Sequence, residues 1–317
     1  MCSSDLTATV FTGKVELGQG ILTSLAQIAA EELDLPIAKL KMISGDTGQT
    51  PNEGMTAGSQ SIENSGLALR LAGAEVRSIL VDLAAKKLGV EASALKVADG
   101  TITAADGRKV TYSELAAETD LKREATAKVA PKNPSTHTIV GKPIERLDIP
   151  AKVFGGSIYV QDMRPQGMVH GRVVRPPRAG STLESFDEAG AKKIPGVIAV
   201  VRDGSFLGVV AEREEQAIKA REALIKSAKW KLGPELPDPN NLYAHLKSLP
   251  SVDQVISNKQ GPVLAFGKTL EATYTKPYMS HGSIGPSASL AEFRDGTMTV
   301  RSEEHTSELQ SHHDLVC

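Results

Sequence analysis

The stretch that decides the fold is "FTGKVELGQG", Phe11 to Gly20. A β-branched run from Thr7 to Thr12 overlaps its start and predicts a strand. The residues directly after it, Ile21 to Leu33, predict a helix, because six apolar residues share one helical face: Ile21, Leu22, Leu25, Ile28, Ala29 and Leu33. Two glycines therefore bracket one glutamine between a strand and the first turn of a helix.

This setting is also that of a dinucleotide-binding fingerprint, which needs a third glycine and an acidic residue roughly 20 residues further on. The sequence Gly18-Gln19-Gly20-Ile21-Leu22-Thr23 lacks the third glycine, so this kind of site is excluded. Free backbone N–H groups at a helix start still favour an anion such as phosphate, and Gln19 adds a donor and an acceptor. A tight turn without a ligand is the alternative, and for an isolated Gly-x-Gly it is the commoner one.

A second polar loop, "GDTGQTPNEGMTAGSQS", runs from Gly45 to Ser61, between a predicted strand at 40–44 and a long predicted helix from about 61 to 88. It ends on Thr56-Ala57-Gly58-Ser59-Gln60-Ser61, where small hydroxyl residues and a glycine precede the helix. These residues favour either a second anion-binding stretch or a helix cap without a ligand.

Three carboxylates flank the two glycine-rich stretches. Glu16 has the chemistry of a general base, but a surface carboxylate or a partner of the helix dipole is the expected role so close to a helix start. Glu53 and Glu63 are candidate groups on the substrate side.

The two ends of the chain differ from the rest. The last stretch, "RSEEHTSELQSHHDLVC", has no apolar period, and its histidines allow a metal-binding tail as one interpretation. Back-translated, however, it resembles a sequencing-library adapter, whose reverse complement encodes Met1 to Leu6. We therefore expect residues 1–6 and 301–317 to be artefactual, and residues 7–300 to be an internal piece of a longer protein.

Composition excludes several classes of protein. Both cysteines lie in the two ends, so residues 7–300 contain no disulfide, thiolate ligand or cysteine nucleophile. The ends hold one arginine against five acidic residues, so the formal net charge changes from −2 to +2 without them. Such a surface gives no reason to expect nucleic acid or an acidic membrane as a partner. No apolar run is long enough to span a membrane. Localisation to the bacterial periplasm or the cytoplasm stays open.

Three segments follow one another between the ends. We expect the first at 7–130, a linker at 131–140, an α+β domain at 141–230, a linker at 231–241 and a third segment at 242–300. In the last two segments, strands are predicted at 156–160, 168–174, 197–201, 207–211 and 269–274, helices at 186–193 and 212–229, and a hairpin through Asp295-Gly296.

Taken together, these motifs resemble a known family. "KVELGQGILTSLAQIAAEELDL" followed by "TAGSQSIENSG" is similar to the molybdenum-binding large subunit of the xanthine dehydrogenase and aldehyde oxidase family. "GKPIERLDIPAKVFGGSIYVQDMRPQGMVHGRVVRPP" resembles that family's α/β hammerhead domain. This order of motifs, with "KPYMSHGSIGPSASLAEF" near the end, resembles the isoquinoline 1-oxidoreductase and nicotinate dehydrogenase-like branch. The implied fold class is α+β, with molybdenum-cofactor-binding segments flanking a hammerhead domain.

The resemblance also implies site residues. Two stretches would bind the cofactor: Gly18, Gln19 and Gly20 would line it, and Thr56, Ala57, Gly58, Ser59, Gln60 and Ser61 would hold the pterin and its phosphates. His281, in a loop beside Gly282, is either a cofactor or substrate ligand or a structural residue. No metal ligand is predicted. The family's catalytic glutamate, from a Gly-Glu loop near the C-terminus, has no match, so the catalytic residue stays unknown.

The function implied by the resemblance is that of a molybdenum hydroxylase. Such an enzyme hydroxylates aldehydes or aromatic N-heterocycles with oxygen from water. In bacteria its molybdenum-molybdopterin cofactor typically takes the cytosine dinucleotide form. The implied partners are a [2Fe-2S] iron–sulfur subunit and a cytochrome c subunit, and a fragment of this kind would be inactive alone. The alternative is a non-enzymatic, mixed α/β binding or scaffold module whose glycine loops are only turns.

Overall fold

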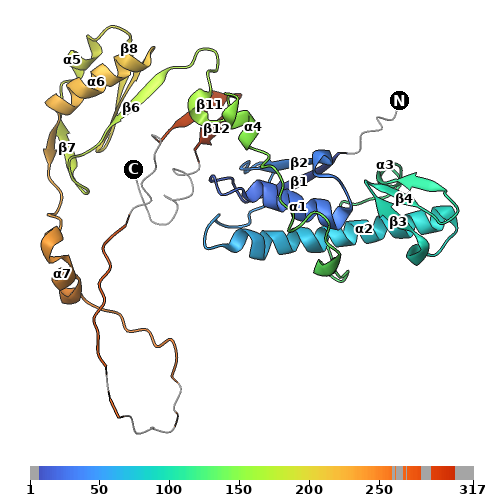
Figure 1. The fold of residues 1–317 in the computed structure, drawn as a ribbon. Helices are drawn as coiled ribbons and strands as arrows, with labels where there is room; N and C mark the ends of the chain where they lie inside the picture. Colours follow the sequence, from blue (N-terminus) through green and yellow to red (C-terminus); the bar gives the residue numbers. More distant parts are fainter. Residues whose placement is uncertain (1–6, 259–260, 262–266, 269, 280–286, 304–317) are drawn as a thin grey trace. The chain divides into compact units, whose positions relative to one another are not determined.

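A computed structural model describes residues 7–258, 261, 267–268, 270–279 and 287–303. The chain divides into two units (Figure 1): unit 1 comprises Met1–Met163 with Gly285–Val316, and unit 2 comprises Arg164–Ile284. Helices and strands are mixed in both, so the predicted α+β class is confirmed. No helix in the described ranges is both long enough and apolar enough to cross a bilayer.

Unit 1 begins with a β-α-β arrangement. Strand β1 (Ala8–Thr12) pairs in parallel with β2 (Leu40–Ser44), and helix α1 (Ile21–Leu33) provides the crossover that a parallel pair requires. The apolar face of α1 is buried as its periodicity predicts, with Leu25 fully enclosed. The two strands and the helix bounds agree with the sequence-based expectation, and the parallel pairing is an addition from the structure.

The second long helix packs closely on α1. Helix α2 (Leu67–Leu88) continues from a short π-helix, η2 (Ser61–Gly66), and ends at Gly89, whose φ of 66° caps it. The two helices approach through glycines: a Cβ on Gly66 would lie 3.0 Å from Ile28 Cδ1, and one on Gly73 would lie 2.9 Å from Glu32 Cβ. Glycine at these two positions therefore sets the distance between α1 and α2.

A small antiparallel sheet covers the other end of α2. It contains β3 (Lys96–Ala98), β4 (Thr101–Thr103) and β5 (Lys109–Thr111), and leads into α3 (Tyr112–Ala116). Thr111 and Glu114 form the predicted capping box. The core here joins helix and sheet residues: Leu35, Leu80, Ala84, Ile102, Val110, Tyr112 and Leu115. Three short 3-10 turns connect the elements: η1 (Ile37–Lys39), η3 (Ala92–Ala94) and η4 (Pro134–Thr136).

Residues 132–142 are here called the strap. The backbone of the strap is hydrogen-bonded to polar side chains of α1. Glu31 Oε2 accepts hydrogen bonds from three successive backbone amides of the strap, at 2.9 Å from Thr138, 2.6 Å from Ile139 and 3.0 Å from Val140. Glu31 is only 1% exposed, so a carboxylate that would be costly to bury is fully paired. Gln27 Nε2 donates to the carbonyls of Ile139 at 3.1 Å and Lys142 at 3.0 Å.

A second buried carboxylate anchors the start of the strap. Glu32 accepts from Arg70 Nε at 3.0 Å and from the Lys132 amide at 2.9 Å. Asp34 also pairs with Lys132 and with Arg77. The segment predicted as a linker at 131–140 is thus hydrogen-bonded to the first segment near both of its ends, at Lys132 and at residues 138–140.

Unit 2 contains a three-stranded antiparallel sheet in the order β6 (His170–Val174), β9 (Phe206–Ala211), β8 (Val197–Asp203). Helices α5 (Glu188–Lys192) and α6 (Glu214–Ser227) pack with the sheet around Val174, Leu207, Val209, Ala220 and Leu224. Strand β7 (Thr182–Ser185) pairs with β10 (Lys229–Lys231). Turn η6 (Pro239–Asn241) and helix α7 (Leu242–Ser248) follow.

The remaining elements belong to unit 1. Helix α4 (Ile149–Val153) and turn η5 (Val160–Asp162) follow the strap. Strands β11 (Ser289–Arg294) and β12 (Thr297–Ser302) form the predicted hairpin through Asp295-Gly296.

Two predicted strands are wrong. Residues 156–160 form no strand and lead instead into the η5 turn. Residues 270–274 of the predicted strand at 269–274 are also without strand structure, and residue 269 lies outside the described residues. Both have the residue types of a strand, but no partner strand pairs with them in the part of the chain that the structure describes. A strand without a partner leaves its backbone groups unpaired, so β propensity alone does not form one.

The pH dependence of unit 1 follows from Glu31. Burial acts to raise the pKa of its carboxyl, but the three strap amides and Lys132 outweigh burial and leave the pKa below the usual 4.5. A lowered folded-state pKa means that this contribution to stability is fully present above pH 4.5. It is lost as the pH falls through the folded-state value.

We expect Glu31→Gln to lower the free energy of unfolding at pH 7 by about 1.5–3 kcal/mol, because the negative charge that strengthens the hydrogen bonds from three amides is removed. The variant should also lose less stability than the wild type between pH 5 and pH 3. Denaturant unfolding at several pH values measures both effects. Glu124→Gln, at an exposed position without a hydrogen bond in the described structure, is the control. Equal acid sensitivity of Glu31→Gln and the wild type would contradict the assignment.

Candidate functional site

The turn between β1 and α1 depends on two glycines. Gly18 has φ of 97° and Gly20 has φ of 81°, in the left-handed region that favours glycine. Gly20 directly precedes Ile21, the first residue of α1, so the predicted motif lies at the helix start.

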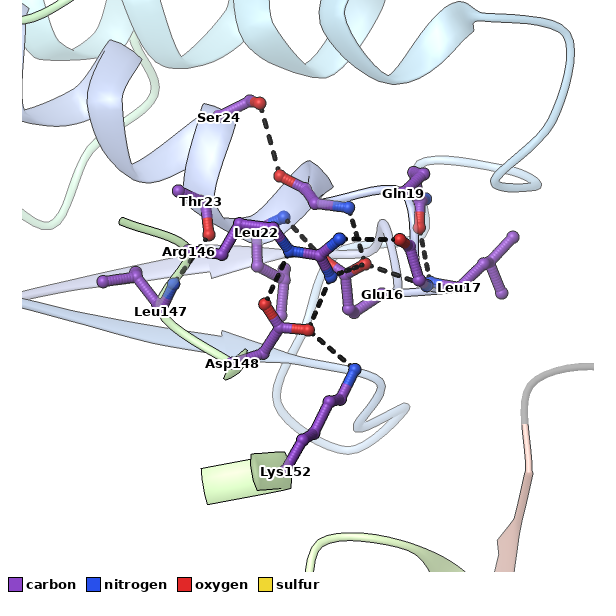
Figure 2. Close-up of polar contacts among 12 residues, drawn as sticks. Glu16, Leu17, Gln19, Leu22, Thr23, Ser24, Arg146, Leu147, Asp148 and Lys152 are labelled. Atoms are coloured by element: carbon purple, nitrogen blue, oxygen red, sulfur yellow. Dashed lines mark hydrogen bonds and ion pairs between the residues drawn. The ribbon is translucent and has the colours of Figure 1, made fainter. Parts of the chain in front are cut away.

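Glu16 occupies the helix start itself. Its Oε1 accepts from the Gly18 amide at 2.9 Å and from the Gly20 amide at 2.7 Å, and its Oε2 accepts from the Leu22 amide at 3.3 Å (Figure 2). The carboxylate thus satisfies orphan donors at the positive end of the helix dipole. Of the two roles expected for Glu16, the partner of the helix dipole is confirmed.

Gln19 folds back on the same turn. Its Oε1 accepts from the Leu17 amide at 2.5 Å, and its Nε2 donates to the Val15 carbonyl at 3.2 Å. The side chain is exposed, so these bonds compete with water and can be exchanged for bonds to a ligand.

An arginine that follows the strap in sequence is hydrogen-bonded to this turn, and we call Arg146, Asp148 and Lys152 the clasp. Arg146 Nη1 donates to the Gly18 carbonyl at 2.8 Å, and its Nη2 lies 3.4 Å from Glu16 Oε1. The same guanidinium makes a bidentate pair with Asp148, with Nε at 2.9 Å and Nη2 at 2.6 Å (Figure 2). Lys152 Nζ adds a contact to Asp148 at 2.7 Å. A chain of alternating charges therefore runs from the helix start to α4.

The charges in this chain reinforce one another. The hydrogen bonds from Arg146 and then Lys152 lower the pKa of the Asp148 carboxyl well below its ordinary value, against the effect of burial. Asp148 raises the pKa values of Arg146 and Lys152 in turn. The Leu147 amide also donates to Thr23 Oγ1 on α1 at 3.0 Å. All three groups of the clasp, Arg146, Asp148 and Lys152, are thus ionised across the physiological range.

The second loop is bound to the turn before Gly18. Glu53 Oε2 accepts from Thr12 Oγ1 and from the Gly13 amide, both at 2.7 Å. The Val15 amide donates to Thr56 Oγ1 at 3.0 Å. These bonds bring Thr56, the first residue of the second predicted stretch, next to the first stretch. They also give Glu53 a structural role, and its expected position on the substrate side stays a prediction.

The rest of that stretch is open to solvent. Ala57, Gly58, Ser59 and Gln60 are exposed, and both Gly58 (φ 63°) and Ser59 (φ 61°) are left-handed, which is uncommon for serine. Within the described residues, no group accepts a hydrogen bond from the Gly58 or Ser59 amide. Buried Ser61 then begins the π-helix that continues into α2.

The two stretches differ in how well they fit an anionic cofactor. The exposed amides of Gly58 and Ser59 and the small side chains at the start of a long helix suit a phosphate group, so residues 57–59 fit, whereas the Gln60 amide already donates to the Ala57 carbonyl. The Gly18 and Gly20 amides do not fit that role as they stand, because Glu16 already accepts from them. In the first stretch, the Gln19 side chain is the group available to a ligand.

Other predicted positions give no site geometry. His281 lies outside the described residues. Glu63 is exposed on η2 and makes no hydrogen bond or ion pair with another described residue. Across the described parts of the chain, no group of three His, Cys, Asp or Glu side chains could hold a metal ion. A cavity of about 580 Å³, lined by residues that include Glu31, Asp34 and Lys132, contains none of the predicted cofactor residues.

Sequence reasoning did not identify Arg146, Asp148 and Lys152. It also missed Lys14, whose Nζ donates to the backbone carbonyls of Glu53 and Met55. Each acts on residues that are distant in sequence or belongs to a group that does; Arg146 lies 128 residues from Gly18. The stretch "ERLD", Glu145 to Asp148, alternates in charge, but this alternation carries no information about a distant partner.

The comparisons with known proteins agree with the resemblance. Residues 2–145 match the family model described as "Molybdopterin cofactor-binding domain". A nicotinate dehydrogenase subunit of Pseudomonas putida is 39% identical over 309 residues, which cover 94% of this chain and 26% of that protein. The membrane-bound aldehyde dehydrogenase (pyrroloquinoline-quinone) of Gluconacetobacter polyoxogenes is 30% identical, covering 92% of this chain and 40% of its own length.

A third relative extends this set. The beta subunit of isoquinoline 1-oxidoreductase from Brevundimonas diminuta is 29% identical, covering 70% of this chain and 33% of that protein. The chain therefore spans between about a quarter and two-fifths of the length of these relatives.

The clasp can be tested by a double-mutant cycle. We expect Arg146→Met and Asp148→Asn to show a coupling free energy of about 1 kcal/mol, because the bidentate pair is only partly exposed and belongs to a network. The coupling should shrink in 1 M salt, which screens exposed charges. Arg175→Met, at an exposed arginine of unit 2, is the matched control. If the effects of Arg146→Met and Asp148→Asn on the free energy of unfolding were additive at low salt, the pair would contribute no coupling energy to stability.

Proposed function

Because residues 2–145 belong to the molybdopterin cofactor-binding domain family, we propose that this chain forms part of the cofactor site of a molybdenum hydroxylase. The reaction class is the hydroxylation of an aldehyde or an aromatic N-heterocycle with oxygen derived from water. The observation that carries the proposal is the junction between Val15 and Thr56, which joins the two predicted cofactor stretches in one place.

The second stretch is proposed to bind the phosphates. The amides of Gly58 and Ser59 directly precede a continuous helical run that ends at Leu88, so backbone donors and the helix dipole both favour a negative group. The open surroundings of Gly58, whose Cβ position has only the Gln60 side chain within 4 Å, leave room for a ligand to approach the backbone.

The first stretch is proposed to act through one side chain. When bound, the molybdenum cofactor supplies the redox chemistry, and the chain binds and orients it. Gln19 offers an amide N–H donor and a carbonyl acceptor from an exposed turn. Glu16 and Arg146 hold that turn, so that the Gln19 backbone keeps one orientation while its side chain exchanges partners.

The finer assignments follow from the names of the relatives and from the family resemblance. We propose the cytosine dinucleotide form of the cofactor, a [2Fe-2S] subunit and a cytochrome c subunit as electron-accepting partners, and a substrate of the aldehyde or N-heterocycle class. The names of the three relatives include nicotinate, isoquinoline and aldehyde, which support this range of substrates. We also propose that residues 141–230 correspond to the hammerhead domain, although residues 141–163 belong to unit 1 by their contacts.

The cofactor content of the protein tests the proposal. The full-length protein, purified with its partner subunits from a bacterial host that makes the molybdenum cofactor, should contain stoichiometric molybdenum and a pterin that fluoresces after oxidation. Finding neither would favour the scaffold alternative. Finding pyrroloquinoline quinone instead, the group in the name of one relative, would also refute the proposal.

Gln19→Ala should separate activity from stability. The side chain is exposed and bonded only within its own turn, so we expect the free energy of unfolding to change by less than about 0.5 kcal/mol. Turnover of the full-length enzyme, loaded with cofactor and bound to its partner subunits, should fall by about 10²-fold, because a preorganised donor is lost.

Gln49→Ala is the control, since Gln49 is also exposed in unit 1 and its side chain bonds only to nearby Asp46. Wild-type turnover of Gln19→Ala at full molybdenum content would remove Gln19 from the site and leave the motif as a turn.

A further inference from the structure

Lys14 is a fully buried lysine in the turn between β1 and the glycine motif, with 0% exposure. A lysine with a fully buried head group is rare, because the ammonium loses its hydration on folding. Neither the proposed function nor the family match assigns this residue a role.

The ammonium of Lys14 is bonded to the second loop. Its Nζ donates to the Glu53 carbonyl and to the Met55 carbonyl, both at 2.7 Å. Both acceptors are backbone groups, so the bonds fix the path of the loop rather than a side-chain rotamer. No carboxylate lies within ion-pair distance of Lys14 in the described part of the chain, so these carbonyl dipoles compensate its charge.

The surrounding contacts make this junction tight. A Cβ on Gly13 would lie 2.2 Å from the Pro51 carbonyl oxygen, so the two backbones touch at a position where only glycine fits. Thr12, itself fully buried, and the Gly13 amide hold the Glu53 carboxylate. The Val15 amide holds Thr56. Lys14 therefore lies within a run of four residues, 12–15, that is bonded to residues 53–56 throughout.

The position of this run relates the two proposed cofactor stretches. Residue 14 is four residues before Gly18, and Met55 is directly before Thr56. A change in the path of residues 53–55 would therefore move Thr56 relative to Gln19.

We infer that Lys14 is a positioning residue, whose buried ammonium sets the distance between the Gly18–Gly20 turn and the Thr56–Ser61 loop. This inference rests on the proposed function for its consequence, the binding of one phosphate-bearing cofactor by both stretches. The positioning itself is a property of the folded chain and can be measured without the cofactor.

Hydrogen exchange in Lys14→Met tests the positioning. Methionine keeps most of the side-chain volume but cannot donate, so a lysine that only fills space would be replaced without local effect. We expect the amides of Gly13 and Val15, which donate to Glu53 and Thr56, to exchange about tenfold faster or more, because bonds from a charged donor are lost. The amides of α2 should keep their wild-type rates.

Lys39→Met is the matched control. Lys39 also donates its Nζ to a backbone carbonyl of unit 1, that of Asp99 at 3.2 Å, but away from both stretches. Unchanged exchange of Gly13 and Val15 in folded Lys14→Met would overturn the inference. If Lys14→Met does not fold, exchange is measured in Lys14→Gln, which keeps a polar end without the charge. Unchanged exchange of Gly13 and Val15 in that variant would also overturn the inference.

Cofactor content separates this inference from the proposed function. If wild-type protein contains molybdenum, Lys14→Met should contain less than half as much, whereas Lys39→Met should match the wild type. Equal content in Lys14→Met and the wild type would overturn the positioning of the cofactor stretches. Absence of molybdenum from the wild type would refute the proposed function, while faster exchange in Lys14→Met would still support the junction itself.

Discussion

The carboxylate of Glu31 accepts three consecutive amides of the strap, and the arrangement of unit 1 around the first glycine motif depends on this interaction. A buried carboxylate without partners would destabilise the fold, so the strap has one position in which α1 can be covered. Gln27 extends the same contact to Lys142. Arg146, four residues after Lys142, then donates to the Gly18 carbonyl.

Polar groups rather than apolar packing thus determine the shape of the candidate site. Arg146, which follows the strap, donates to the glycine turn at Gly18, and Lys14 donates to the carbonyls of Glu53 and Met55 in the second loop. Apolar contacts are not directional, whereas each of these bonds fixes a donor and an acceptor. A site that must hold a ligand at defined distances benefits from this kind of support.

Local elements were predictable because they depend on local patterns. Helix α1 and strand β2 have the predicted bounds, since periodicity and caps decide them. The failures at 156–160 and 270–274 depend on the presence of a partner strand, which no local pattern reports. The partners of Lys14 and Arg146 could not be predicted either. A charged residue in a strand or loop is expected to be exposed to solvent unless its distant partner is known. The glycine motif itself was recognised, but its amides were expected to be free, and Glu16 takes them.

The order in which the chain is synthesised gives the strap a further consequence. Glu31 and the amide of Thr138 are separated by 107 residues. At a synthesis rate of about 5–20 residues per second, α1 leaves the ribosome roughly 5–20 s before its polar partners exist. During that interval β1, α1, β2 and α2 can associate through contacts close in sequence, and Arg70 can pair with Glu32, while Glu31 remains hydrated. Closure of the strap is then a late, long-range step, and the clasp on the glycine turn forms only after it. A nascent chain halted before residue 138 should therefore hold a helical core whose glycine turn is not yet bonded to Arg146.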